Sequence, residues 1–269
     1  MTEPTVFDEI FSRLTPERVL HDPRSTGEGV AVAVIDSGVE RAILEKRFAD
    51  RGQPFQPIDG AVFRPNVPTP LPYDGHQSSP HGTTVADIIL TVAPRVTLYS
   101  ADVFGPQGTC EVETVVAAIR HAIDVWKVKV INLSLGVPEH KLQQAPRRLL
   151  LQRTIEEAYF RDVLIFAAAH NDHPTTRSYP AAFAPPLISV DKSLFDDPLR
   201  FAYVLREQIE FQAHSRGYLG PFSREPATSW ATPHLAGIAA RVLSLKPDLK
   251  PFEIKTILYW LFKAGAKSA

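Results

Sequence analysis

The stretch VAVAVI, residues 30–35, decides the fold class. It is apolar at every position, whereas a strand with one face in water would alternate apolar and polar residues. A continuous run of this kind is typical of a parallel sheet that is covered on both faces. Similar runs follow in VTLYSADV (96–103), VKVINLSL (128–135), VLIFAAA (163–169) and LISV (187–190). We therefore predict a central, mostly parallel sheet.

Helical patterns alternate with these predicted strands. Apolar residues recur with the spacing of one helix face over residues 85–92, 112–126 and 146–160, and another helix is expected from Pro251 onward. Strand–helix–strand alternation with right-handed crossovers predicts a three-layer α/β fold, with helices on both faces of the sheet. In such sheets the chemistry lies beyond the carboxyl ends of the strands.

The 269 residues are expected to form one domain, residues 1–269, and the apolar content of 44% is ample for its core. Residues 1–26 are interpreted as an N-terminal extension. Five prolines in residues 60–80 predict a long surface loop. The region 191–228 has a mixed pattern and receives no assignment.

Charge and composition exclude several classes of partner. The net charge of −1 gives no electrostatic reason for binding nucleic acid or an anionic membrane. The longest apolar runs fall well short of the roughly 20 residues that a membrane-spanning helix needs. Cys110 is the only cysteine, so an intrachain disulfide is impossible, in keeping with a reducing compartment. We expect no nucleic-acid partner and no membrane association.

Three polar residues stand at the ends of predicted elements. Asp36 directly follows the strand 30–35, His81 opens the helix HGTTVADII (81–89), and Ser229 precedes a helix with Pro233 in its first turn. Each has an ordinary structural explanation, respectively a turn-capping carboxylate, an exposed or capping imidazole, and an N-cap hydroxyl.

Together the three residue types also fit a proton relay. A carboxylate orients an imidazole, the imidazole takes the proton of a serine, and the serine oxygen attacks a carbonyl. Asn171, at the end of the strand 163–169, offers an amide donor that could stabilise the resulting oxyanion. From the residues alone, the relay and the structural roles both remain open.

Five motifs resemble those of the subtilisin-like serine proteases, the subtilases. They are VAVIDSGV (32–39) for the Asp motif, HGTTVADII (81–89) for the His motif, VINLSLG (130–136) for the substrate-binding strand, AAAHN (167–171) for the oxyanion segment and ATSWATPHLAG (227–237) for the Ser motif. They occur in the family order and the resemblance spans residues 27–265. It implies a triad of Asp36, His81 and Ser229, with Asn171 in the oxyanion hole.

The resemblance further implies a protein or peptide substrate bound as an added strand. This strand would lie between residues 134–136 and the edge segment near Gly108. The residues implied in substrate binding are Gly108, Ser134, Leu135, Gly136, Val137, Ala168 and His170. Because Val137 and His170 stand where the family usually has glycines, we expect a narrowed slot that excludes large aromatic P1 side chains. Glu111, near the expected S2/S4 edge of the substrate cleft, is expected to favour basic residues upstream of the cleaved bond.

Other departures from the family pattern lie beside the expected triad. Thr84 replaces a second histidine, Asp87 a glycine, Ala227 a glycine and Trp230 a methionine. Segment ILTVAPRV (89–96) runs directly from helix to strand, without the calcium loop of many secreted members. We expect no metal site and no cofactor.

Two other functions were weighed against an endopeptidase. The substitutions near the triad would suit a pseudoprotease that binds peptides without cleaving them. An acyl hydrolase of lipids or small esters would call for a G-x-S-x-G elbow, which ATSWA is not. No propeptide precedes the motifs, which suggests an excised catalytic domain or an intracellular enzyme; we expect a cytoplasmic location and leave a regulatory or inhibitory partner open.

Overall fold

The computed structural model describes residues 5–105, 108–206, 208–223 and 225–268. In this part of the chain a nine-stranded sheet has the order β10-β11-β9-β7-β5-β1-β4-β2-β3. Its strands are β1 Ala31–Asp36, β2 Asp59–Val62, β3 Leu71–Pro72, β4 Thr97–Asp102, β5 Val130–Leu133, β7 Leu164–Ala168, β9 Ile188–Ser193, β10 Phe201–Arg206 and β11 Ile209–His214. All five predicted strands are confirmed.

Strand β1 lies at the centre of a parallel block. It pairs in parallel with β4 on one side and with β5 on the other. The registers continue in parallel from β5 through β7 and β9 to β11. Consequently the carboxyl ends of these strands lie along the same edge of the sheet, where the predicted site residues follow them.

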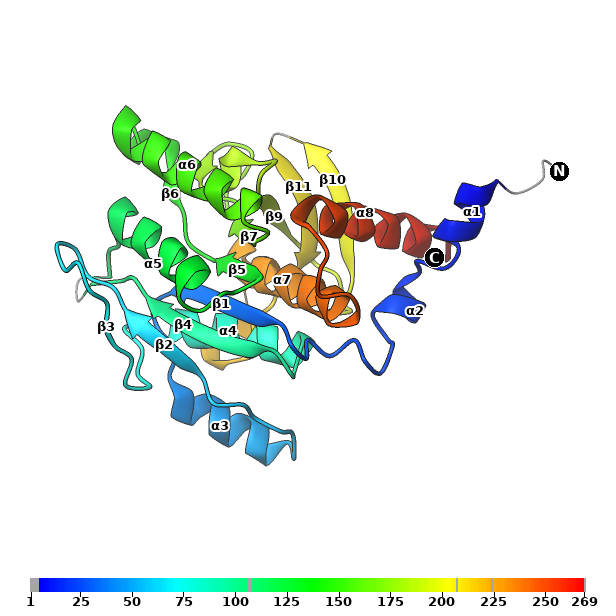
Figure 1. The fold of residues 1–269 in the computed structure, drawn as a ribbon, viewed down its shortest axis with the longest axis horizontal. Coiled ribbons are helices and arrows are strands. Elements are labelled where there is room, and N and C mark those ends of the chain that lie inside the picture. Colours follow the sequence, from blue (N-terminus) through cyan, green and yellow to red (C-terminus); the bar gives the residue numbers. More distant parts are fainter. Residues whose placement is uncertain (1–4, 106–107, 207, 224, 269) are drawn as a thin grey trace.

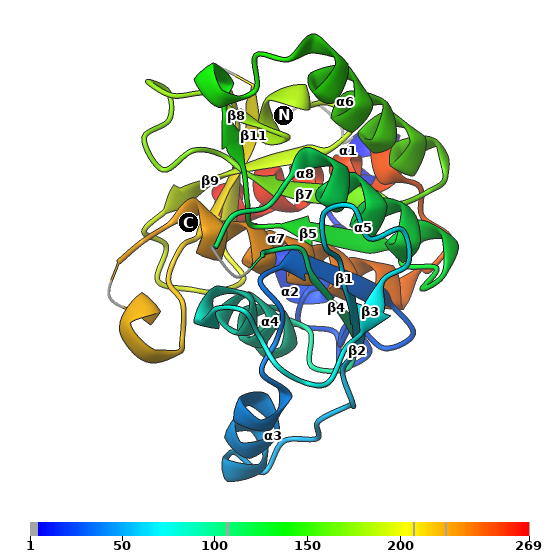
Figure 2. The ribbon, with the colours of Figure 1, turned by 90° about the vertical axis from the view of Figure 1, so that its left-hand side faces the viewer.

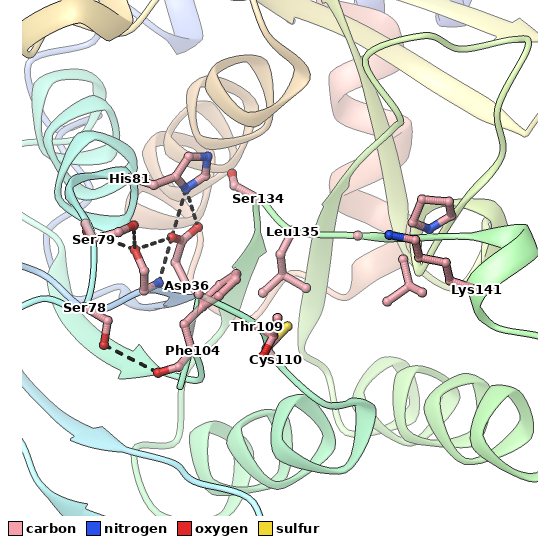
Figure 3. A pocket seen from close by; sticks show the side chains of 15 residues that line it. Asp36, Ser78, Ser79, His81, Phe104, Thr109, Cys110, Ser134, Leu135 and Lys141 are labelled. Atoms are coloured by element: carbon pink, nitrogen blue, oxygen red, sulfur yellow. Dashed lines mark hydrogen bonds and ion pairs between the residues drawn. The ribbon is translucent and has the colours of Figure 1, made fainter. Parts of the chain in front are cut away.

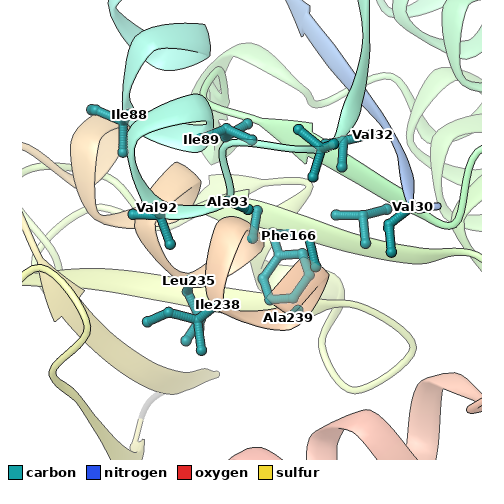
Figure 4. Packing of buried hydrophobic residues seen from close by; sticks show 14 of the residues in the cluster. Val30, Val32, Ile88, Ile89, Val92, Ala93, Phe166, Leu235, Ile238 and Ala239 are labelled. Atoms are coloured by element: carbon teal, nitrogen blue, oxygen red, sulfur yellow. The ribbon is translucent and has the colours of Figure 1, made fainter. Parts of the chain in front are cut away.

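Two hydrophobic cores lie on opposite faces of this sheet. Val32 and Val34 of β1 belong to one core, together with side chains of α4 Pro80–Val92, α7 Thr228–Leu245 and α8 Pro251–Ser268. Figure 4 shows part of this core, in which Phe166 lies near Ala239. The alternate residues of the same strand therefore face the other core, which explains why the run 30–35 is apolar throughout.

The second core is closed by two long helices. Ala33 and Ile35 pack with apolar residues of α5 Val112–Asp124 and α6 Ala145–Phe160. Figures 1 and 2 show these two helices side by side. The three-layer α/β prediction, with helices on both faces, is confirmed.

The proline-rich stretch is less irregular than predicted. Within residues 60–80, β2 and β3 form an antiparallel pair, and β2 also pairs in parallel with β4. Pro80 already belongs to α4. Gly60 permits the close approach of β2, because a Cβ atom there would lie 2.1 Å from the Ser100 carbonyl oxygen. The unassigned region 191–228 contains the antiparallel hairpin of β10 and β11.

The N-terminal segment packs against the end of the chain. It carries the short helices α1 Val6–Phe11 and α2 Pro16–Val19. The Phe11 ring stacks on Trp260 of α8, with ring centroids 3.4 Å apart. Arg241 of α7 donates to the Leu20 carbonyl at 3.1 Å and to the Val92 carbonyl at 2.5 Å. Among the described helices, none is long and apolar enough to cross a membrane.

Candidate active site

Asp36 occupies the last position of β1 and is 1% exposed. Its Oδ1 accepts hydrogen bonds from the Ser37 amide at 2.7 Å and from the Ser37 hydroxyl at 3.1 Å. The same hydroxyl accepts from the Gly82 amide at 3.1 Å. Strand and helix are thus tied together around one carboxylate, whose orientation is fixed before any substrate binds.

His81 is the second residue of α4 and faces this carboxylate. Its Nδ1 lies 2.9 Å from Asp36 Oδ1 and 3.0 Å from Oδ2 (Figure 3). This arrangement places the Nδ1 proton on the Asp36 side and leaves Nε2 as the acceptor. Burial lowers the pKa of His81, but the charge and hydrogen bond of Asp36 raise it, and the net effect is a pKa above the ordinary value.

Ser229 lies in the first turn of α7 and does not cap it. The N-cap is Ala227, and no side chain caps this helix. The Ser229 hydroxyl donates to the Ser134 carbonyl at 3.4 Å, while the Ser134 hydroxyl donates to the Ser229 carbonyl at 2.9 Å. Among the hydrogen bonds of the described residues, none joins Ser229 to His81.

Trp230 brings the start of α7 to His81. Its indole is 4% exposed, and its ring centroid lies 4.8 Å from that of the imidazole. Since Ser229 is the residue before it and Ser134 lines the same cavity as His81, the structure gathers all three predicted triad members at one edge of the sheet.

Asn171 follows β7 and is held from two sides. Its side-chain Oδ1 accepts from the Thr228 amide at 2.9 Å and from the Thr228 hydroxyl at 3.2 Å. Its backbone carbonyl accepts from Lys192 Nζ at 2.8 Å. Because Oδ1 is bound to the start of α7, the NH2 group is left as the donor of this amide.

The site opens into a cleft of about 580 Å³. The expected substrate-binding residues that line it are Gly108, Ser134, Leu135, Gly136 and Val137, together with Asp36 and His81. Figure 3 shows Leu135 between the catalytic side and the far end of the cleft at Lys141. The added-strand segment predicted from the sequence therefore forms a wall of the same cavity as the acid–base pair.

The other expected substrate residues lie apart from this cleft. Ala168 is buried at the end of β7, and His170 lines a separate cavity of about 10 Å³. Val137, by contrast, lines the cleft and pairs with Tyr179 where β6 Val137–Pro138 meets β8 Ser178–Tyr179. The two residues expected to narrow one slot are thus placed in two different cavities. Their effect on P1 preference stays a prediction.

The departures beside the triad have structural partners. Thr84 donates its hydroxyl to the Pro80 carbonyl at 3.1 Å, within α4. Asp87, fully buried, accepts from Arg47 Nε at 2.6 Å and so links α4 to α3 Arg41–Asp50. Burial raises the pKa of Asp87, although Arg47 acts in the opposite direction. Both substitutions serve helix packing, outside the Asp36–His81 pair.

Two other kinds of chemistry, metal binding and attack by a thiol, can be compared with the described residues. Across the described ranges, no group of three or more His, Cys, Asp or Glu side chains could hold a metal ion. Cys110 lines the cleft, and burial raises its pKa to about 11. Its thiol is therefore protonated at neutral pH and is a weak nucleophile.

Sequence reasoning missed the residues that support the site from behind. Ser134 was expected only to bind substrate, yet it exchanges two hydrogen bonds with Ser229. Lys192 follows the run 187–190 by two positions, and nothing in its local pattern points to Asn171. The two residues are brought together by the parallel pairing of β7 with β9, and this pairing cannot be deduced from local sequence.

Comparisons with known proteins point to one family. The family model described as the Subtilase family matches residues 27–194. Subtilisin E of Bacillus subtilis (strain 168) is 31% identical over 248 residues, which cover 85% of this chain and 59% of the relative. Subtilisin of Bacillus pumilus is also 31% identical over 248 residues, covering 85% of this chain and 82% of the relative. The chain likewise spans about 60% of the length of the M-protease of Shouchella clausii (strain KSM-K16) and of Subtilisin NAT of Bacillus subtilis subsp. natto.

Solved structures show the same fold. The structure named S41 Psychrophilic Protease superposes with a TM-score of 0.67 at 23% identity, covering 90% of this chain and 87% of that one. The extent of the family match, the level of identity to the subtilisins and the placement of the five motifs lead to one conclusion: this chain belongs to the subtilase family.

Proposed function

We propose that this chain is a serine endopeptidase that cleaves peptide bonds through an acyl-enzyme on Ser229. The observation that carries the proposal is the His81–Asp36 pair, in which one imidazole nitrogen meets both carboxylate oxygens beside the cleft. Family membership supports proteolysis in general. The assignment of each residue's role is our inference from the contacts.

The first half of the reaction forms the acyl-enzyme. Ser229 Oγ attacks the carbonyl carbon of the scissile bond while its proton passes to His81 Nε2. Asp36 keeps the imidazole in the tautomer that can accept this proton and stabilises the imidazolium that results. The Ser229 hydroxyl turns from the Ser134 carbonyl toward the imidazole, because catalytic hydrogen bonds often tighten only when substrate is bound.

The oxyanion is stabilised by the Asn171 NH2 group. Thr228 fixes the opposite end of this amide, so the donor needs little rearrangement as charge develops. The start of α7 adds a favourable potential for negative charge. His81 then gives its proton to the leaving amine, and the C–N bond breaks.

The second half repeats the proton transfers with water. Water attacks the ester carbonyl of the acyl-enzyme while its proton passes to His81, and that proton then returns to Ser229 Oγ as the acid product leaves. No group beyond Asp36, His81, Ser229 and Asn171 is needed for this balance. The substrate is a peptide that extends along the wall formed by residues 134–137.

The test is covalent labelling followed by peptide hydrolysis. A fluorophosphonate probe should label the parent and leave Ser229→Ala unlabelled. Ser37 is unsuitable as a control position because its hydroxyl contacts Asp36. Ser223→Ala is the matched control, since this exposed serine bonds only locally to Gly220. Ser229→Ala should lose several orders of magnitude in kcat on a peptide ester. A Ser229→Ala protein that is labelled or turns over like the parent would refute the assignment.

The pseudoprotease alternative has no support in the contacts. Thr84 and Asp87 are engaged away from the Asp36–His81 pair, and Trp230 packs against His81 without displacing it from the carboxylate. The acyl-hydrolase alternative likewise gains nothing, because the relatives that match 85% of this chain are subtilisins.

A further inference from the structure

The far end of the cleft carries a positive charge. Lys141 ends the short 3-10 helix Glu139–Lys141 and lines the same cavity as Asp36 and His81. Figure 3 shows its side chain directed toward Leu135, with the catalytic pair on the other side of that leucine. A peptide that extends along the cleft from the scissile bond thus meets the Lys141 ammonium several residues away.

This charge has no compensation within the cleft lining. Asp36 is buried and hydrogen-bonded to His81, on the other side of Leu135 from Lys141. The Cys110 thiol, with its pKa raised to about 11, is neutral at physiological pH. Among the other described lining residues the side chains are uncharged, so Lys141 sets the sign of the potential at its end of the cleft.

Nearby carboxylates are engaged elsewhere. Glu139 accepts a hydrogen bond from the Tyr179 hydroxyl at 3.1 Å. Glu111 and Glu113 face Arg147 at 3.9 Å and 2.8 Å, and they line a different cavity. No carboxylate of the described residues forms an ion pair with Lys141. Glu111, from which the sequence predicts a basic preference, lines that other cavity, whereas Lys141 has no carboxylate partner in the lining of the cleft.

We propose that the cleft selects peptides carrying an Asp or Glu side chain at the position that reaches Lys141. The inference rests on the proposed endopeptidase function and adds a substrate class to it. An ion pair at an exposed site is worth a preference of about 1.4- to fivefold in kcat/KM, following the roughly 0.2–1 kcal/mol typical of such pairs. The preference should weaken with added salt, because exposed charges are screened.

The experiment is a positional peptide library in which Glu, Gln and Lys are exchanged at each position around the scissile bond. It is run on the parent, Lys141→Met and Lys141→Glu. The parent should favour Glu over Lys at one position, Lys141→Met should abolish that ratio, and Lys141→Glu should reverse it. The ratio within each variant is independent of its overall activity. Lys46→Met, an exposed lysine on α3 away from the cleft, is the matched control and should keep the parent's ratio.

The outcomes separate the two proposals. Hydrolysis of a single-residue ester by the parent tests the endopeptidase function alone, because such a substrate is too short to extend along the cleft. If the ester is cleaved while the Glu-to-Lys ratio is the same in the parent, Lys141→Met and Lys141→Glu, only the specificity inference is overturned. If the parent cleaves neither ester nor peptides, the proposed function falls and the specificity falls with it.

Discussion

At the scale of single residues, His81 is subject to opposing influences. Burial favours the neutral imidazole, whereas the charge and hydrogen bond of Asp36 favour the imidazolium, and the net result is a raised pKa. A general base must be neutral to accept a proton. Under the proposed function, the carboxylate that orients His81 should therefore also shift the onset of activity to higher pH.

This balance predicts the pH profile. In the parent, kcat/KM should rise with pH through a transition above about 6.5, the ordinary imidazole value. In Asp36→Asn, the carboxylate charge that raises the pKa of His81 is gone, while the burial that lowers this pKa remains. The transition should therefore move to lower pH. The rate should also fall by about 10⁴-fold, because the tautomer is no longer enforced. Initial rates from pH 5 to 9 check both points, and a transition at the same pH in both proteins would contradict them.

A second residue-scale prediction concerns Lys192. Its ammonium holds the Asn171 carbonyl at 2.8 Å, and it therefore positions the proposed oxyanion donor. Lys192→Met should lower kcat by roughly 10-fold with KM nearly unchanged, given about 1.5 kcal/mol for a hydrogen bond to a charged group. Lys192→Arg retains a donor and should recover part of the loss.

Asn171→Ala is the reference for this effect. It should lower kcat by roughly 10²–10³-fold, a general magnitude that itself derives from a subtilisin. In the Asn171→Ala background, Lys192→Met should lower kcat little further, because the side chain that Lys192 positions is already missing. Additive losses in the double variant would mean that Lys192 acts by another path.

At the scale of elements, the junction between β1 and α4 leaves almost no space. A Cβ atom on Gly82 would lie 2.2 Å from the Gly38 carbonyl oxygen and 3.3 Å from Asp36 Oδ1. Gly82→Ala must therefore push the first turn of α4 away from β1. We expect a cost of about 1–3 kcal/mol in unfolding free energy and a more than 10-fold loss of kcat/KM.

Gly265→Ala is the matched control for this prediction. Gly265 lies in α8, where the added carbon would meet Pro16 at an ordinary 3.4 Å. Chemical unfolding and ester hydrolysis on both variants give the comparison. If Gly82→Ala keeps the parent's activity, the close junction is not what holds His81 against Asp36.

The elements differ in how far the sequence reveals them. The central strands could be predicted because both faces are buried and every position is apolar, as in residues 30–35. The hairpin of β10 and β11 could not, because β10 is a partly exposed edge strand whose pattern fades toward Arg206. Likewise, prolines in residues 60–80 hid β2 and β3, whose pairing depends on β4 far along the chain.

At the scale of the whole molecule, the fold and the family could be predicted, whereas the supporting contacts could not. Local periodicity indicates strands and helices, and the motifs indicate the family and the candidate site residues. Neither indicates that Trp230 packs against His81 or that Ser134 exchanges hydrogen bonds with Ser229, because these contacts depend on how distant segments meet. The supporting residues become visible only once the layers are assembled.

Arg241 provides a test of how the layers are joined. From α7 it donates both to Leu20 in the N-terminal segment and to the end of α4 at Val92. Arg241→Ala should lower the free energy of unfolding by about 2–4 kcal/mol, because two carbonyls lose a charged donor. Arg24→Ala, whose side chain is 80% exposed, should change it by less than about 1 kcal/mol. Equal effects in urea unfolding would show that Arg241 does not link these layers.

The position of Ser229 on α7 has a consequence for synthesis of the chain. Asp36 and His81 fall in the first third of the sequence and the attacking serine in the last fifth. A ribosome therefore completes the acid–base pair long before it adds the serine, and α7 must then pack under strands that already exist. Under the proposed function, a chain whose translation stops early carries Asp36 and His81 without the attacking Ser229. We therefore expect interrupted synthesis to yield fragments that cannot cleave other proteins.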